Sequence, residues 1–571
     1  MAHSSSAASQ APPAVPPGCK GVDDVDIVPD EGVSAVTRQL LEGCIRRSFT
    51  HVSQVTQLIR QGADPRAIGS LHGRGTSGAP FSRWRYSCLC FAIDSPTNYP
   101  FLRASDRSVL AVPVALPQWS SRELQRDVIN ALVDGGAEMN GGGLERRPIT
   151  VAVRAGNLTA VEALLERQAN VRGVRAMGLP YLYAACSVTR EYEDTLISVY
   201  RRLAQHDSTL AAEWFAGDSL VHWAVRSSTG LFSQSFIDQY LTLITSHGVE
   251  MMAANAIGQS PLQAAALYGS PRVAHWLCRK LTADDINRGW PNEPNMTPLA
   301  IAAEELDRHI QQLQEQQQGE WHEYRSRRIR EDKTTIGVLL RGGAAPSIAR
   351  MPTATQKRHR ERQLVLAEYA TVLSELSEVV MSAINGALAP QRDHSMLLAR
   401  LLPLAPHHDG AHPHPSPSNM AFGPHEAEAI AWKIGAFLHE PPAAVAAIDE
   451  CFIGESVLRR RVKAAVGHFV KLAATQTSSN REVIGGMANL GGVTVRVPLQ
   501  CFAVRGSGGQ VVLTGVREVV HRARLDEAGT HGVVGVVKGF NEHLGDQDCQ
   551  FEWGQLGHLS RTGLFVPLGV E

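Results

Sequence analysis

The chain has 571 residues, 44% of them hydrophobic, which is enough for roughly three to four domains with substantial packed cores. Its 55 basic and 56 acidic residues leave a formal net charge of -1. This balance excludes a global electrostatic attraction to nucleic acid or to an anionic membrane, and leaves only local charged patches open.

Nine cysteines are scattered along the chain, and none of them forms a Cys-x-x-Cys pair. An odd, dispersed set of this kind is typical of reduced thiols in the cytosol or nucleus. The N-terminal segment MAHSSSAASQAPPAVPPG has no basic start followed by an apolar stretch, so we expect no secretory signal there. No stretch approaches the ~18 consecutive apolar residues of a membrane span. We therefore expect a soluble cytoplasmic protein, with the nucleus as the alternative location, and no membrane partner.

The first 33 residues are rich in Ser, Ala and Pro and then become acidic. Such a composition cannot bury a core, so residues 1–33 are predicted to be a disordered tail. From residue 34 to residue 349, helix-like stretches alternate with Gly and Pro breaks at recurring intervals.

The clearest of these stretches runs from residue 147 to residue 169. Pro148 opens a short helix, where its missing N–H costs nothing, and Gly156 ends that helix. Val161, Leu164 and Leu165 then form one apolar stripe of a second helix. A hairpin this short cannot stand alone in water, so it needs stacked neighbours on both sides.

Similar openings recur within residues 34–349, and several of them are degenerate. The further openings begin at Ser87, Leu179, Ser219, Ser260 and Thr297. Their clearest spacings are 32, 41 and 37 residues. The pattern resembles the ankyrin repeat, whose signature is a Thr-Pro-Leu-His-x-Ala opening and a period of about 33 residues.

The ankyrin resemblance implies a mainly α fold, an ankyrin-type solenoid of about seven degenerate helical hairpins over residues 34–349. Insertions are expected near residues 94–126 and 304–333. Another kind of helical-pair solenoid is the alternative. We expect the polar segment 304–333 to extend the first helix of its repeat into solvent, the alternative being an arm that contacts an acidic partner.

The remainder of the chain divides by composition. We predict a long helix over 350–402, a linker rich in Pro and His over 403–424, short helices over 425–480 and a small antiparallel β domain over 481–571. Within the last segment, apolar alternation on both sides of Gly506–Gly509 predicts a β-hairpin.

Three later stretches of this β domain are Gly529–Val537, Cys549–Gly554 and Leu564–Leu568. Their order is similar to SH3-like barrels of the mind-bomb or KOW kind, with an unrelated small sheet as the alternative. The resemblance implies binding of a peptide or of nucleic acid.

No catalytic or metal-binding motif supports an enzyme. The sequence contains no His-Glu-x-x-His, no Gly-x-Ser-x-Gly, no Walker A loop and no kinase signature. The histidines of 407–414 lie among prolines and are expected to belong to a polar linker. Cys88 and Cys90 are expected in a core, and the basic run 459–461 on a solvated helix face. We predict no catalytic residue, no metal and no cofactor; an enzyme hidden in residues 357–571 is a third hypothesis.

These observations predict a protein–protein interaction scaffold or adaptor that binds an unidentified partner on the concave ankyrin surface, with no small-molecule substrate. The alternative is a nucleic-acid or chromatin-binding module that uses the C-terminal barrel, although we do not expect nucleic acid as the main partner. The resemblance directs attention to residues just before each opening, where exposed Trp and Arg could dominate binding. The predicted partner-binding residues are Arg146, Arg147, Gln259, Trp290, Asn292, Asn295 and Met296.

Overall fold

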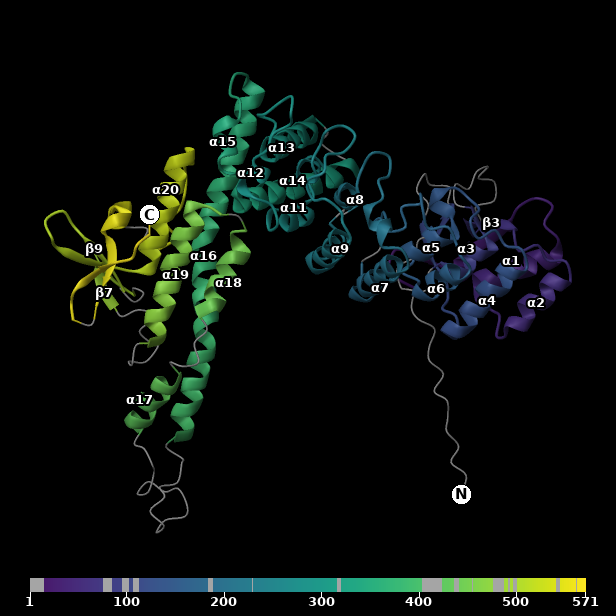
Figure 1. The fold of residues 1–571 in the computed structure, drawn as a ribbon, viewed down its shortest axis with the longest axis horizontal. Helices are drawn as coiled ribbons and strands as arrows, with labels where there is room; N and C mark the ends of the chain where they lie inside the picture. The colour runs from purple at the N-terminus through teal and green to yellow at the C-terminus, as the bar shows by residue number, and fades with distance from the viewer. Residues whose placement is uncertain are drawn as a thin grey trace, which may run out of the picture. The chain divides into compact units, whose positions relative to one another are not determined.

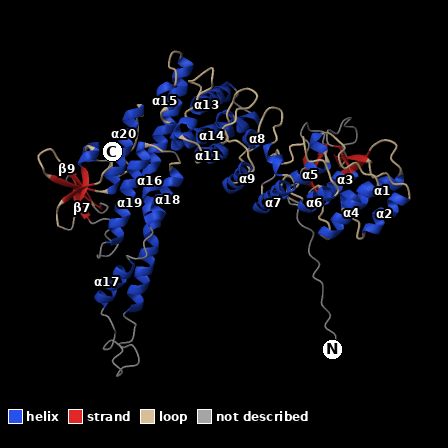
Figure 2. Ribbon diagram, viewed as in Figure 1, coloured by secondary structure: helices blue, strands red, loops and turns tan. Residues whose placement is uncertain are grey.

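The computed structural model is mainly helical, as the sequence predicts, with a few small sheets (Figures 1 and 2). The chain divides into two compact units, residues 1–276 and 277–571. The residues described are 15–74, 85–94, 102–105, 112–182, 188–227, 230–315, 320–402, 424–435, 441–453, 455–475, 487–490, 493–496, 501–540, 545–560 and 562–570.

Pairs of helices make up most of the first unit. They are α1 (Ala35–Arg46), α2 (Val52–Arg60), α3 (Cys88–Ile93), α4 (Arg122–Asp134), α5 (Pro148–Arg154), α6 (Leu158–Glu166), α7 (Arg190–His206), α8 (Leu220–Ser227), α9 (Gln234–Ser246), α10 (Pro261–Leu267) and the start of α11 (Pro271–Cys278). Along one layer α1 packs on α3 and α3 on α5; along the other α2 packs on α4 and α4 on α6. Further along, α6 packs on α7, α7 on α9, and α8 on α10.

The predicted hairpin at residues 147–169 is present as α5 and α6. Pro148 is the first residue of α5, and Gly156 takes a positive φ of 61° that turns the chain toward α6. Val161, Leu164 and Leu165 are all buried, as the apolar stripe predicts. In α3 every residue is buried, including Cys88 and Cys90, and burial raises the pKa of Cys90 to about 11. Both thiols therefore belong to the core.

A six-stranded sheet also belongs to the first unit. Its strands are β1 (Lys20–Gly21), β2 (Val25–Pro29), β3 (Ile68–Gly73), β4 (Arg85–Ser87), β5 (Leu102–Ser105) and β6 (Val112–Ala115). The prediction of a disordered tail over 1–33 is wrong for β2, which pairs antiparallel with β3. Val25 and Ile27 alternate with acidic residues and bury their side chains in this sheet. Residues 1–14 lie outside the described part of the chain.

Longer helices dominate the second unit. They are α12 (Ala283–Ile286), α13 (Pro298–Glu315), α14 (Glu320–Leu339), α15 (Ser347–Arg350), α16 (Gln356–Leu401), α17 (Pro424–Gly435), α18 (Pro441–Cys451), α19 (Val457–Thr475) and α20 (Val516–His531). Helix α16 lies where the sequence predicts a long helix, and α17 to α19 where it predicts short ones. The predicted linker and its histidines, residues 403–423, lie outside the described residues.

The polar insertion 304–333 prolongs a helical hairpin, as expected. Helix α13 continues to Glu315, and α14 packs along it. A buried hydrogen bond joins the two helices, with Nδ1 of His309 2.6 Å from Oδ2 of Asp332. The insertion is thus part of a packed pair.

The C-terminal sheet contains β9 (Phe502–Arg505), β10 (Val511–Thr514), β11 (Leu556–Leu559) and β12 (Phe565–Pro567), in the antiparallel order β10-β9-β11-β12. Strands β7 (Met487–Leu490) and β8 (Val493–Arg496) form a separate hairpin. The predicted hairpin around Gly506–Gly509 is present as β9 and β10.

The sequence predicted strands over Gln510–Arg522 and Gly529–Val537, and this is wrong where α20 occupies residues 516–531. Val516, Val519, Val520 and Ala523 are buried at helical spacing on one face, and α20 packs on α16 and α19. The β-branched valines therefore belong to a helix whose stability comes from packing rather than from intrinsic propensity. The strand order expected from the SH3-like resemblance is interrupted at this point.

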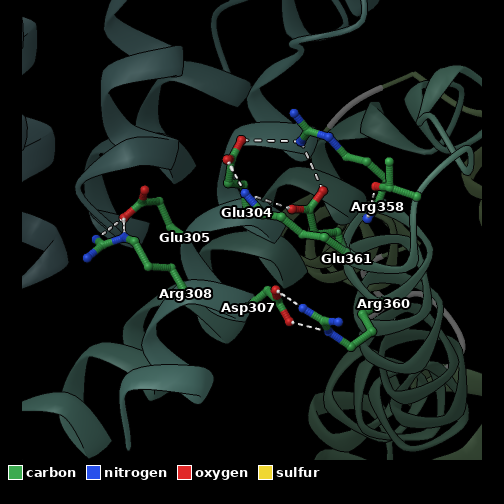
Figure 3. Close-up of polar contacts among 9 residues, drawn as sticks. Glu304, Glu305, Asp307, Arg308, Arg358, Arg360 and Glu361 are labelled. Carbon is green, nitrogen blue, oxygen red and sulfur yellow. Dashed lines mark hydrogen bonds and ion pairs between the residues drawn. The ribbon is translucent and has the colours of Figure 1, made fainter. Parts of the chain in front are cut away.

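Ion pairs fasten α16 to α13 (Figure 3). Glu304 accepts from Nζ of Lys357 at 2.7 Å and from Nη1 of Arg358 at 3.3 Å. Arg358 also donates to Oε2 of Glu361 at 2.9 Å. One helical turn further along α13, Asp307 accepts two hydrogen bonds from Arg360, at 3.2 and 3.1 Å. Asp307 and Glu361 are both nearly inaccessible to solvent, so their charges depend on these partners.

Replacement of Glu361 by glutamine should destabilise the second unit by about 1.5–3 kcal/mol, because the buried hydrogen bond from Arg358 then goes to a neutral oxygen and loses its charge assistance. The measurement is urea unfolding of the full chain. The matched control is E378Q on the same helix, where the glutamate is exposed, with an expected change within about 0.5 kcal/mol. Equal unfolding midpoints for the two variants would contradict the role given to Glu361.

Candidate protein-interaction surface

Two tight loops stand directly before the short helices α8 and α10 in the first unit. In the first loop, Phe215 and Asp218 exchange backbone hydrogen bonds of 2.9 and 3.0 Å around Ala216 and Gly217, both of which have positive φ. The second loop spans residues 255–260 and is closed by a hydrogen bond from the backbone of Asn255 to the carbonyl of Gln259. Positive φ favours Gly at such turns, and Ala216 adopts it within a closed pair of hydrogen bonds.

Hydrogen bonds join the two loops to each other. The backbone N–H of Ala256 donates to the carbonyl of Gly217 at 2.9 Å, and the side-chain amide of Asn255 donates to Asp218 at the same distance. His222, on α8, is 1% exposed and donates from Nε2 to the carbonyl of Gln259 at 2.9 Å. With Nε2 as the donor, Nδ1 accepts from the hydroxyl of Ser219 at 2.8 Å. The loops therefore form one hydrogen-bonded unit rather than two independent turns.

Large apolar side chains gather on and beside these loops. Trp214 is 51% exposed, Tyr181 is 49% exposed and Ile257 is 73% exposed. Phe215 and Trp223 lie behind them, with ring centroids 5.9 Å apart, and Tyr181 lies 6.4 Å from Trp223. We call Tyr181, Trp214, Phe215, Trp223 and Ile257 the apolar patch.

Two arginines hold the patch in place. The guanidinium of Arg175 lies 4.0 Å from the centroid of the Trp223 ring and 5.5 Å from that of Phe215, which is a cation–π arrangement. Arg226 lies 5.4 Å from the same Trp223 ring and forms an ion pair with Asp218 at 2.9 Å. Trp223 also donates its indole N–H to the carbonyl of Phe215. These contacts hold the rings of Trp223 and Phe215 in place.

The predicted residues of the first unit have different environments. Arg146 is exposed in the short helix η2 (Leu144–Arg146), and Arg147 caps α5 and is half-buried. Gln259 was predicted to bind a partner, and this is wrong: it is 2% exposed. Its turn folds it inward, since its carbonyl accepts from His222 and its N–H donates to the side chain of Asn255. Gln259 is a structural residue of the loop.

The other predicted residues form the loop before α13 in the second unit. Backbone hydrogen bonds from Glu293 to Trp290 and from Met296 to Glu293 shape this loop. Asn292 and Asn295 are exposed, whereas Trp290 and Met296 are half-buried. The indole nitrogen of Trp290 is covered and has no hydrogen-bond partner among the described residues. The seven predicted residues are thus divided between the two units.

Trp214, Phe215 and Tyr181 were not predicted, although the sequence carried a signal for two of them. Trp214 and Phe215 stand just before the opening at Ser219. The reasoning that selected Arg147 before Pro148 applies equally to them. Tyr181 carries no comparable signal. Its position depends on a tertiary contact with Trp223 on α8, which the sequence does not reveal.

Side chains of the metal-ligating and basic types are located in the described part of the chain. No group of three or more His, Cys, Asp or Glu residues within it is arranged to hold a metal ion. In the basic run of α19, Arg459 pairs with Asp449 at 2.8 Å and Arg461 with Asp526 at 3.0 Å, so these charges are engaged within the second unit. None of the described helices has the length and apolar character needed to cross a bilayer.

Comparison with known proteins identifies no family. No family model matches the chain, and no curated protein matches its sequence significantly.

Acidification should weaken the loop structure through His222. Burial lowers the pKa of His222 below its ordinary value of 6.5, so its neutral form stabilises the fold above about pH 6.5. This contribution is lost as the pH falls, because the unfolded chain takes up the proton more readily. We expect the urea midpoint to drop between pH 7.5 and 5.5, and to drop less in H222Q.

The matched control for this prediction is H206Q, which alters an exposed histidine of the same unit. It should show the same pH dependence as the unaltered chain. If H222Q and H206Q lost equal stability on acidification, His222 would not be the titrating group.

Proposed function

We propose that the helix pairs of residues 34–349 are ankyrin-type repeats and that the chain is a protein-interaction scaffold or adaptor. In this proposal a partner binds the loop tips and the adjoining short helices, on the concave side that ankyrin proteins use. The observation that carries the proposal is the apolar patch, which leaves Trp214 and Ile257 largely exposed on neighbouring, hydrogen-bonded loops.

The ankyrin part of the proposal is supported by the order of packing. Short helices such as α3 and α5 contact the equivalent helices of the next pairs, and the longer helices α4 and α6 do the same in a second layer. Tight loops precede α8 and α10. Ser260 and Gln263 form a capping box at the start of α10, and Pro261 is its first residue. The ankyrin-like openings of the sequence lie at these helix starts.

The binding part of the proposal rests on composition and rigidity. Trp, Tyr and Arg are the residues that most often dominate binding energy at protein interfaces. Adjacent exposed apolar side chains are uncommon unless a partner covers them. Since Trp223 and Arg175 fix the patch, a partner would lose little conformational entropy in ordering it.

We propose the cytoplasm or the nucleus as the location. Cys44, Cys88 and Cys278 are buried with free thiols, which suits a reducing compartment.

Affinity capture with the full chain tests the function. In cells that express this protein, the W214A/I257S variant should recover its true partners at least about tenfold less well than the unaltered chain, since hot-spot residues contribute about 2 kcal/mol or more. Quantitative mass spectrometry measures the recovery. The control is I68S, which alters an exposed isoleucine on β3, outside the patch, and should leave recovery unchanged.

A circular dichroism spectrum and a melting curve show whether each variant is folded. If the folded W214A/I257S variant recovered the same proteins in the same amounts as I68S, the apolar patch would not be the binding surface.

A further inference from the structure

A cavity of about 230 Å³ lies next to Trp214, between the loop that precedes α8 and the turn that follows α9. Its lining includes the side chains of Glu213, Trp214 and Ser219 on one side and of Val249 and Glu250 on the other. Small-molecule sites usually measure about 300–1,000 Å³, so this cavity suits a single side chain better than a whole small molecule.

The cavity is acidic and has an aromatic wall. Two acidic residues, Glu213 and Glu250, are among its lining residues, and no basic residue is. The ring of Trp214 is half-exposed and belongs both to the cavity and to the apolar patch. Trp214 is therefore the residue that the cavity and the patch share.

The negative charge of Glu213 is only partly compensated. Its side chain is 22% exposed, and the nearest guanidinium nitrogen, on Arg172, lies 3.7 Å from Oε1. That arginine is itself 55% exposed, and it also pairs with Asp207 and contacts Thr209. Burial raises the pKa of Glu213, an effect that a further cation in the cavity would oppose.

We propose that the cavity receives a lysine or arginine side chain from the protein partner. The cationic group would lie between the carboxylates of Glu213 and Glu250 and against the ring of Trp214, while neighbouring residues of the partner cover Trp223 and Ile257. Opposite charge and the aromatic ring both favour a cation there. This inference rests on the proposed function and specifies the chemistry of the partner: a segment with a basic residue flanked by apolar ones.

Selection from a random displayed-peptide library on the full chain provides the probe. Peptides that bind in a Trp214-dependent way should share one lysine or arginine among apolar residues. For a synthetic copy of such a peptide, fluorescence anisotropy should show at least about tenfold weaker binding when its basic residue is changed to glutamine.

The E213Q/E250Q variant should lose a similar factor for the original peptide, and the glutamine peptide should then bind the variant and the unaltered chain alike. The single variant E250Q leaves Glu213 unchanged and alters an exposed position, so a folding defect is not expected. It should bind the original peptide with a smaller loss of affinity than the double variant. E138Q, at another exposed glutamate of the same unit, is the control and should bind as the unaltered chain does.

The outcomes separate this inference from the proposed function. Peptides that need Trp214 but no basic residue, or that bind E213Q/E250Q as well as the unaltered chain, would overturn the inference and leave the proposed function standing. A selection that yields no Trp214-dependent peptide would overturn both.

Discussion

The first unit depends on the mutual burial of very short helices. Helices α3, α5 and α10 have six or seven residues each, well below the roughly 12–15 at which an isolated helix becomes marginally stable in water. Nearly all of their side chains are buried against neighbouring helices. Each helix therefore exists only because the next one covers it. The loops that precede α8 and α10 contribute few side chains to the core. Their tips can therefore hold exposed apolar residues such as Trp214 and Ile257.

Loop tips that are free of the core would ordinarily be mobile, and buried hydrogen bonds prevent this here. His222 reaches from α8 to the carbonyl of Gln259 in the next loop, and Asn255 reaches back to Asp218. These groups are almost completely removed from water, so leaving any one of them without its partner would cost about 1–3 kcal/mol. The same two loops thus carry both the buried hydrogen bonds and the apolar patch. The hydrogen bonds fix the geometry of the loops, and the patch is exposed.

How much could be predicted from the sequence depended on whether the signal was local. Pro148, Gly156 and the stripe of Val161 and Leu164 predicted α5 and α6, because capping and periodicity act over a few residues. Helix α20 was missed since its valines favour strands in isolation, and only packing on α16 and α19 makes their helical spacing decisive. Strand β2 was missed because Asp26 and the acidic residues on both sides of the strand hid the alternation of Val25 and Ile27.

Placement at the candidate site was harder to predict for the same reason. Position before a helix opening correctly marked the loops, but it could not distinguish Gln259, which turns inward, from Trp214, which turns outward. That difference depends on the contacts of Asn255 and His222 with the neighbouring loop. The helix openings of the sequence therefore locate the loops, whereas tertiary hydrogen bonds decide which of the loop side chains are exposed.

The sign of the charge that this surface favours in a ligand depends on what its arginines already contact. An exposed Trp–Arg surface suggests an acidic partner at first sight. However, Arg226 is neutralised by Asp218, and Arg175 lies against the rings of Trp223 and Phe215. The carboxylate of Glu213 lies 3.7 Å from Nη1 of Arg172, and no basic residue is among those that line the cavity beside Glu213 and Glu250. Under the proposal made above, a basic side chain of a partner would lie beside Trp214, and its apolar neighbours would cover the rings.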